Sequence, residues 1–210
     1  MKESIIVTLD REFGSGGHEV GKYLADKLGL DFYDDEFIAE AAAKTGFHEE
    51  YIRRNEENVP SVSMGSLFGG VDIFHSSPAD QIQAEEVRVI KEIAEKGNCV
   101  IIGRAADYIL KDTVHVSIFV YAPLEARIQR IKSRQGLYHL DESDASIEKT
   151  IKAVDKQRKR YYEFYTDNKW GARDSYDLLI NTSRTGIDGA GMIIETYIKE
   201  CRGKDILSDF

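Results

Sequence analysis

Three glycines and two basic residues lie within eight positions near the start of the chain, in the segment Arg11-Glu12-Phe13-Gly14-Ser15-Gly16-Gly17-His18. The segment follows a short apolar run and precedes a helical pattern. A loop at such a position presents backbone N–H groups and a helix N-terminus to an anion, and glycines let the backbone approach a phosphate closely. A glycine-rich connection without a ligand is the alternative. The setting between strand and helix favours a phosphate site, formed by Gly14, Ser15, Gly16, Gly17 and His18.

The segment departs from the standard phosphate-loop pattern G-x-x-x-x-G-K-[ST]. In that alignment Arg11 takes the place of the first glycine and Gly16 that of the second. Gly17 then stands where the lysine belongs, and His18 stands where the magnesium-binding hydroxyl belongs. The positive charge that normally reaches the β- and γ-phosphates is therefore missing from its usual position.

Three nearby basic residues could supply that charge. Arg11 borders the loop, His18 opens the helix, and Lys22 lies one helical turn further along. We favour Arg11, because His18 can equally be an ordinary helix N-terminal residue and Lys22 is distant. Ser15 could place a hydroxyl near a magnesium ion, although its spacing does not require this.

A second basic group follows the buried strand 99–102. Arg104 stands directly after Gly103, at the carboxyl edge of the expected sheet, where a guanidinium can bind a phosphate in bidentate fashion. A salt bridge at the end of the strand is the alternative.

Two later helical segments carry further arginines. Within 124–134, a basic stripe borders the apolar face and consists of Arg127, Arg130 and Arg134. Such a stripe suits a lid that closes over phosphates. A basic face that is simply solvated is the alternative. Within 143–165, Arg158 projects from an apolar stripe and so requires an anion. A transferring phosphoryl group would provide it, and Asp155 or Glu163 could pair with it instead.

Acidic residues follow the second expected strand, at Asp34, Asp35 and Glu36. Asp34 or Asp35 could contact a phosphate acceptor or its magnesium ion. Acids at a helix N-terminus also stabilise the helix dipole, and we expect that simpler role for at least two of the three.

The elements that must position these residues alternate along the chain. Apolar runs and helical periodicity predict an α/β protein with a parallel sheet covered on both faces, whose ligands bind at the carboxyl ends of the strands. A long connection at about 55–80 is rich in Gly, Ser and Pro and is expected to be mobile. Strands are expected at 5–9, 31–33, 99–102, 115–121 and 176–180, and helices at about 20–28, 37–45, 78–97, 124–134, 143–165 and 187–199.

Composition limits the classes of function. The 210 residues carry a formal net charge of −9 and a pI near 5.1, which argues against binding to nucleic acid. No apolar run is long enough for a signal peptide or a membrane span, so we expect a cytoplasmic protein with no membrane partner. Nothing indicates a homo-oligomer, and the two cysteines have no metal-site spacing.

Four segments together resemble the cytidylate kinase-like branch of the nucleoside monophosphate kinases, within the P-loop fold. They are TLDREFGSGGHEVGKYLADKLGL, CVIIGRAADYIL, DKQRKRYYEFYTDNKWG and YDLLINTS, and the resemblance covers nearly the whole chain. It implies one domain over 1–210 with a three-layer α/β/α fold, a mostly parallel five-stranded sheet and a helical lid at about 124–165.

The resemblance also implies an activity and a set of roles. It implies magnesium-dependent transfer of the ATP γ-phosphoryl group to a nucleoside monophosphate, with CMP or dCMP as the expected acceptor. Cytidylate kinases bind the acceptor with a Gly-Arg-Asp segment, so Arg104 and Asp107 are expected to bind it here, although Ala105-Ala106 displaces the acid. The residues expected to act in catalysis are Arg11, Arg127, Arg130, Arg134 and Arg158.

Two other functions remain open at this point. One is a kinase of the same fold with a different small acceptor. The other is a catalytically silent nucleotide-binding or sensory protein that has lost its lysine.

Overall fold

The five strands form one parallel sheet in the order β2-β3-β1-β4-β5. The computed structural model describes residues 4–34, 78–134 and 143–203. This arrangement confirms the predicted α/β fold with its parallel sheet. The strands are β1 (Ile6–Arg11), β2 (Asp31–Tyr33), β3 (Cys99–Ile102), β4 (Val116–Tyr121) and β5 (Leu178–Asn181).

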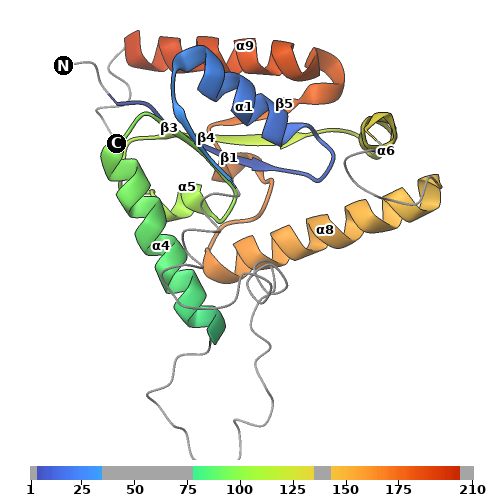
Figure 1. Cartoon of the computed structure of the whole chain (residues 1–210), viewed down its shortest axis with the longest axis horizontal. Helices are drawn as coiled ribbons and strands as arrows, with labels where there is room; N and C mark the ends of the chain where they lie inside the picture. Colours follow the sequence, from blue (N-terminus) through green and yellow to red (C-terminus); the bar gives the residue numbers. More distant parts are fainter. Residues whose placement is uncertain (1–3, 35–77, 135–142, 204–210) are drawn as a thin grey trace, which may run out of the picture.

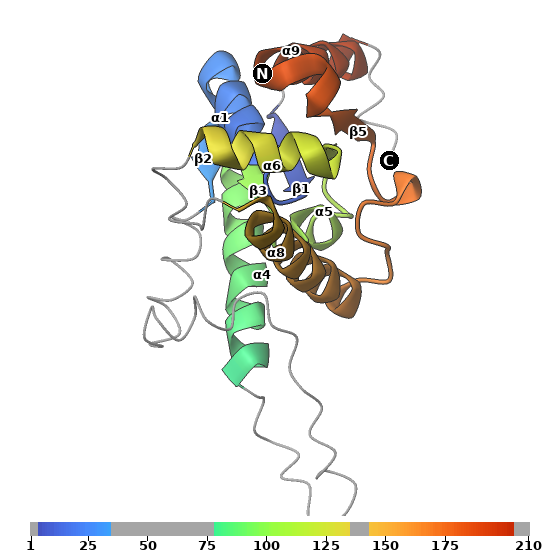
Figure 2. The ribbon, with the colours of Figure 1, turned by 90° about the vertical axis from the view of Figure 1, so that its right-hand side faces the viewer.

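Helices cover both faces of the sheet, which gives three layers (Figure 1). Helices α1 and α9 lie on one face, and α4, α5 and α8 lie on the other. Figure 2 shows α6 beside α8, outside these two layers. The helices are α1 (Gly17–Leu28), α4 (Pro78–Lys96), α5 (Ala106–Ile109), α6 (Leu124–Ser133), α8 (Asp144–Tyr165) and α9 (Thr182–Gly203), with a 3₁₀ helix at Arg173–Ser175.

The alternation of side chains along β1 explains how the site is built. Val7 and Leu9 point into the apolar layer beneath α1 and α9. Ile6 packs in the opposite layer with α4, and the alternation sends Thr8 and Asp10 to that same face. Strand β1 thus delivers a buried acid, Asp10, to the carboxyl end of the sheet.

Most elements begin and end close to their predicted positions, with some differences; β1, for example, ends at Arg11 and not at residue 9. Strand β5 begins at Leu178, two residues later than expected. Helix α9 begins at Thr182 and contains a break at Gly186, with φ 68° and ψ −177°, so its regular part starts at Ile187 as predicted. The short helix α5 was not predicted.

Two predicted segments lie wholly or largely outside the described residues. The helix expected at 37–45 is one, and the connection expected to be mobile at 55–80 is the other, of which only the start of α4 at Pro78 is described. Among the described helices, none is long and apolar enough to cross a membrane.

Helices α6 and α8 form the segment predicted as a lid. They pack together through an apolar cluster that includes Ile128, Ile131, Ile147 and Ile151. Phe13 of the glycine-rich loop packs against this cluster. The two helices therefore share a core with the loop that they border.

Candidate functional site

A cavity of about 340 Å³ opens at the carboxyl ends of β1 and β3. The glycine-rich loop, the turn after β3, and helices α6 and α8 surround it. Although the protein has a net charge of −9, several positive side chains line this cavity. Five arginines line the cavity: Arg11, Arg104, Arg130, Arg134 and Arg158.

The glycine-rich loop turns sharply at two of its glycines and lines the cavity. Gly14 and Gly16 have φ of 76° and 88°, in the left-handed region that glycine adopts without strain. Gly16 is also the N-cap of α1, and its carbonyl accepts a hydrogen bond from the Val20 N–H at 3.0 Å. The first turn of α1 therefore faces the cavity, with Gly17 and His18 in its lining.

The Arg11 side chain fills the space beside Gly17. A Cβ atom added at Gly17 would lie 2.4 Å from Arg11 Cβ and 2.8 Å from Arg11 Cγ. A Cβ added at Gly103 would lie 2.2 Å from Arg11 Nη1. The arginine therefore runs from the loop to the edge of β3, through the space that a lysine at position 17 would enter.

An acid lines the cavity beside two of the predicted phosphate-binding residues. Asp34 Oδ1 is 3.7 Å from Arg11 Nη2, and Asp34 Oδ2 is 3.5 Å from His18 Nε2. Asp34 therefore belongs to the cavity, as predicted from its position after β2. Asp35, predicted beside it, lies outside the described residues.

Arg130 of α6 and Arg134, the C-cap of that helix, contact the loop and α1 from the opposite side. Arg130 Nη1 donates to the Gly14 carbonyl at 2.8 Å, and its Nη2 donates to Thr182 Oγ1 at 3.3 Å. Arg134 forms an ion pair with Glu19 of α1. Both guanidinium groups line the cavity, and their roles in catalysis remain predictions.

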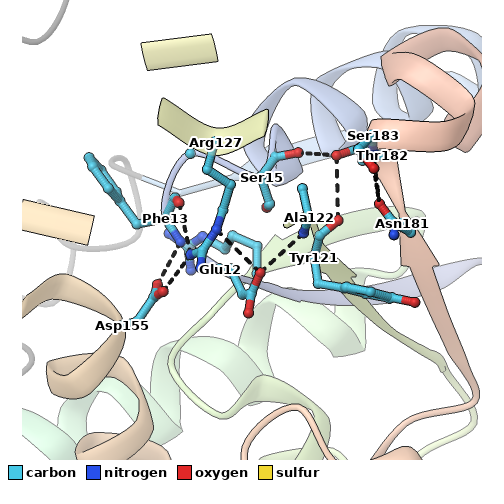
Figure 3. A network of polar contacts seen from close by, with 12 residues as sticks. Glu12, Phe13, Ser15, Tyr121, Ala122, Arg127, Asp155, Asn181, Thr182 and Ser183 are labelled. Atoms are coloured by element: carbon cyan, nitrogen blue, oxygen red, sulfur yellow. Dashed lines mark hydrogen bonds and ion pairs between the residues drawn. The ribbon is translucent and has the colours of Figure 1, made fainter. Parts of the chain in front are cut away.

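Arg127 is one helical turn from Arg130 but points elsewhere. Its Nη1 donates to Asp155 Oδ2 at 2.5 Å and to the Phe13 carbonyl at 3.3 Å, and its Nε lies 3.6 Å from Glu12 Oε2 (Figure 3). Asp155 Oδ1 accepts from the Phe13 N–H at 2.7 Å. The structure therefore separates Arg127 from the cavity to which we assigned it, and places it behind the loop.

Glu12 and Ser15 complete this buried network. Glu12 Oε2 accepts from the Ala122 N–H at 3.1 Å, and burial raises the pKa of Glu12. The Ser15 carbonyl accepts from Thr182 Oγ1 at 2.5 Å. The Ser15 hydroxyl is fully buried, has no hydrogen-bond partner within the described parts of the chain, and does not line the cavity. Its position gives no support to a magnesium contact.

Arg158 of α8 reaches the cavity, as predicted from its place in the apolar stripe. Its Nη1 donates to the Arg11 carbonyl at 3.1 Å, and its guanidinium carbon lies 5.8 Å from the centre of the Phe13 ring. Of the acids that we considered as partners, Asp155 pairs with Arg127, and Glu163 lies 3.8 Å from Lys169 Nζ.

Sequence reasoning missed the acid on the floor of the cavity. Asp10 Oδ2 accepts from Trp170 Nε1 at 2.8 Å and from the Tyr176 hydroxyl at 3.2 Å, while Oδ1 accepts from the Arg11 N–H at 2.9 Å. Burial raises the pKa of Asp10 in spite of the charges of Arg11 and Arg158. An acid inside an apolar strand was the signal that could have revealed it.

The turn after β3 aims Arg104 into the cavity. Gly103, Arg104 and Ala105 have φ of 75°, 59° and 51°, three left-handed residues in succession. For the two that are not glycine this backbone is costly, and such strain persists only where the surroundings hold it. The Arg104 Nη1 atom lies 3.6 Å from Glu86 Oε1, and its side chain is 8% exposed.

Asp107, the second residue predicted to bind the acceptor, does not line this cavity. Its carboxylate accepts a hydrogen bond from the Tyr162 hydroxyl at 2.6 Å, and burial raises the pKa of Asp107 to about 7. It lines a different cavity of about 420 Å³, together with Lys111 and His115. The structure therefore separates Asp107 from Arg104, because the intervening alanines start helix α5.

The family model of the cytidylate kinase-like family matches residues 6–184 of the chain. The chain belongs to this family. Its relatives include a cytidylate kinase of Methanocaldococcus jannaschii, 27% identical over 198 residues, with 92% of this chain and 97% of that protein covered. A cytidylate kinase of Methanococcus vannielii is 30% identical over 200 residues, with 93% and 100% covered. The resemblance stated from the sequence is thus confirmed.

Solved structures agree on the fold. An uncharacterized protein from Eubacterium ventriosum is similar with a TM-score of 0.71 and 28% identity, over 94% of this chain and 99% of that one. A shikimate kinase from Bacteroides thetaiotaomicron is similar with a TM-score of 0.57 and 15% identity, over 94% of this chain and 99% of that one. This member of the cytidylate kinase-like family therefore has the P-loop kinase fold predicted from its sequence.

Proposed function

We propose that the protein is a kinase that transfers the γ-phosphoryl group of MgATP to CMP or dCMP. The observation that carries this proposal is the convergence of five arginines on one cavity beside the glycine-rich loop. The family supports the nucleotide acceptor, since relatives over nearly the whole chain are named cytidylate kinases.

In the proposed reaction a phosphate oxygen of CMP attacks the γ-phosphorus of ATP. The bond between that phosphorus and the oxygen bridging it to the β-phosphate breaks, and ADP leaves. The attacking oxygen of a phosphate carries no proton that must be removed, so the protein contributes positioning and charge stabilisation.

Each group around the cavity has a role that follows from its place. The N–H groups of the loop and of the first turn of α1 hold the donor phosphates. Arg11 supplies the charge that a lysine at position 17 would otherwise supply, since its side chain occupies that space. Arg104 binds the acceptor phosphate, and Arg130, Arg134 and Arg158 surround the transferring group.

Magnesium enters this proposal with ATP as part of the donor substrate. Mg²⁺ commonly keeps several waters and binds protein through one or two carboxylates. Asp34 fits that requirement, because it lines the cavity and its carboxylate lies beside Arg11. Asp10 fits it less well, because both of its oxygens already accept hydrogen bonds.

A coupled assay that detects ADP, run with each nucleoside monophosphate and its deoxy form, tests the proposal. We expect the highest kcat/KM with CMP or dCMP. Arg11→Ala should abolish most of the activity, whereas Arg160→Ala, at an exposed position of α8, should leave it unchanged. Stabilisation of the folded protein by nucleotide without phosphoryl transfer to any acceptor would overturn the proposal and favour a silent nucleotide-binding protein.

A further inference from the structure

A buried acid on α4, Glu86, contacts two side chains that line the cavity. Glu86 is 2% exposed and does not line the cavity. Its Oε2 accepts a hydrogen bond from the Tyr161 hydroxyl at 2.6 Å, and its Oε1 lies 3.6 Å from Arg104 Nη1. Arg104 and Tyr161 both line the cavity. Glu86 therefore stands behind the arginine that we assign to the acceptor phosphate.

The three residues hold one another in place. A buried carboxylate is costly unless it is paired and hydrogen-bonded, and the same is true of a buried guanidinium. The Arg104 guanidinium carbon also lies 5.7 Å from the centre of the Tyr161 ring. These contacts fix the direction of a side chain whose backbone stands at φ 59°.

The same cluster reaches the donor side of the cavity through α8. Tyr161 lies three residues after Arg158, whose Nη1 donates to the Arg11 carbonyl at 3.1 Å. Helices α4 and α8 lie side by side on this face of the sheet (Figures 1 and 2). Helix α8 thus contacts Arg11, which supplies charge to the donor, and Glu86, which supports the acceptor arginine.

We propose that Glu86 is a positioning residue that couples the acceptor subsite to the donor subsite. It holds Arg104 toward the acceptor phosphate and, through Tyr161, ties this arginine to α8. An acceptor bound to Arg104 then favours the α8 position in which Arg158 and Arg11 meet the donor. This inference rests on the proposed function.

Glu86→Gln tests the coupling, because it keeps the size of the side chain and an oxygen for Tyr161 but removes the charge that faces Arg104. Tyr161→Phe keeps the ring but removes the hydroxyl, so it breaks the tie to α8 alone. Glu95→Gln is the matched control, since Glu95 is exposed on the same helix. Each variant should first be shown to be folded by its thermal unfolding.

The measurement is the Kd for CMP with and without a non-hydrolysable ATP analogue. The fluorescence of Trp170 can report binding, because it is the single tryptophan of the chain and lines the cavity. For the wild type and for Glu95→Gln we expect the analogue to tighten CMP binding about tenfold, a usual size for coupling between sites. Glu86→Gln and Tyr161→Phe should bring that ratio close to one, and Glu86→Gln should also raise the KM for CMP more than that for ATP.

Three results would overturn the inference, and they differ from one another. A wild-type coupling ratio in both folded variants would overturn it while the kinase function stands. Equal increases in the KM of CMP and ATP for Glu86→Gln would show a merely structural role for Glu86. A wild-type protein that neither binds nor phosphorylates CMP would overturn the proposed function itself, and this inference with it.

Discussion

Arg11 and Arg104 enter the same cavity from the ends of neighbouring strands, and each lies near one carboxylate, Asp34 or Glu86, but the space around them differs. Arg11 lies in space that two glycines leave open, since a Cβ at Gly17 or Gly103 would approach it to 2.4 Å or 2.2 Å. Arg104 lies against filled space, beside the carboxylate of Glu86. Its backbone is left-handed, and that conformation costs about 1–3 kcal/mol for a residue other than glycine.

This difference indicates which substitutions each subsite should tolerate. Where a cation lies in space that glycines leave open, substitutions that add side-chain atoms to those glycines should weaken its function most. Where a cation is held by an acidic partner, substitutions that remove that partner or its charge should weaken the function of the cation most. The four predictions that follow test this contrast, from the largest expected effect to the smallest.

Gly17→Lys restores the usual phosphate-loop lysine, yet we expect it to lower kcat/KM for ATP about 10³-fold, the size of effect that a phosphate-directed cation has in such enzymes. The new side chain would compete with Arg11 for one space. Arg11→Gly combined with Gly17→Lys should recover at least about tenfold over either single variant, since it restores the first glycine and the lysine of the standard pattern.

Steady-state kinetics of the two single variants and the double variant measure this effect. Gly189→Ala is the matched control, because a Cβ there meets only Thr185 Cβ at an ordinary 3.4 Å. A fully active Gly17→Lys single variant would contradict the idea that Arg11 has replaced the lysine.

Arg127→Met should act on stability rather than on binding. The substitution leaves Asp155 and Glu12 behind the loop without their cation, and breaking such a partly buried pair costs about 3 kcal/mol of unfolding free energy. Urea denaturation measures it, with Arg160→Met on the exposed face of α8 as the control. An unchanged free energy of unfolding with a raised KM for ATP would return Arg127 to the role of a lid arginine.

Arg104→Lys keeps the charge at the acceptor side but loses the planar fork of the guanidinium. We expect the KM for CMP to rise roughly 30-fold, since a charged hydrogen bond is worth about 1.5–3 kcal/mol. The KM for ATP should rise less, by no more than about tenfold, because the donor side loses only its coupling to the acceptor. Equal changes in both constants would show that the two subsites are not separate.

Asp107→Asn should alter only the pH dependence of stability. Burial raises the pKa of Asp107 from an ordinary value of 3.8 to about 7, so the folded protein retains a proton that the unfolded chain has lost. The contribution of Asp107 to stability is therefore full below pH 3.8 and falls as pH rises toward 7.

Unfolding free energies measured at several pH values check this prediction. Between pH 4 and 7 the wild type should lose roughly 1 kcal/mol per pH unit more than Asp107→Asn does. Parallel curves for the two proteins would show that the pKa of Asp107 is not raised in the folded protein.

Much of the site could be predicted because its signals are local. The glycines between the first strand and helix mark the loop that lines the cavity, and the position of Arg104 after β3 places it at the carboxyl edge. Arg158 was predictable because it interrupts an apolar stripe. Each of these inferences uses residues that lie within one or two adjacent elements.

The rest could not be predicted because it depends on contacts between distant parts of the chain. Asp10 meets Trp170 across 160 positions, and Glu86 meets Tyr161 across 75. No periodicity reveals either pair, since Asp10 fits an ordinary strand, Glu86 and Tyr161 fit ordinary helices, and Trp170 lies in a turn.

The sequence by itself determined the order of strands and helices, the parallel sheet and the place of the glycine-rich loop, because these follow from short-range periodicity and glycine geometry. Only the tertiary structure decided which arginines face the cavity. Arg127 and Arg130 lie three residues apart on α6, yet Asp155 of α8 holds the first behind the loop, while the second donates to Gly14. The physical reason is that a buried charge points toward the nearest opposite charge, and folding alone decides where that charge lies.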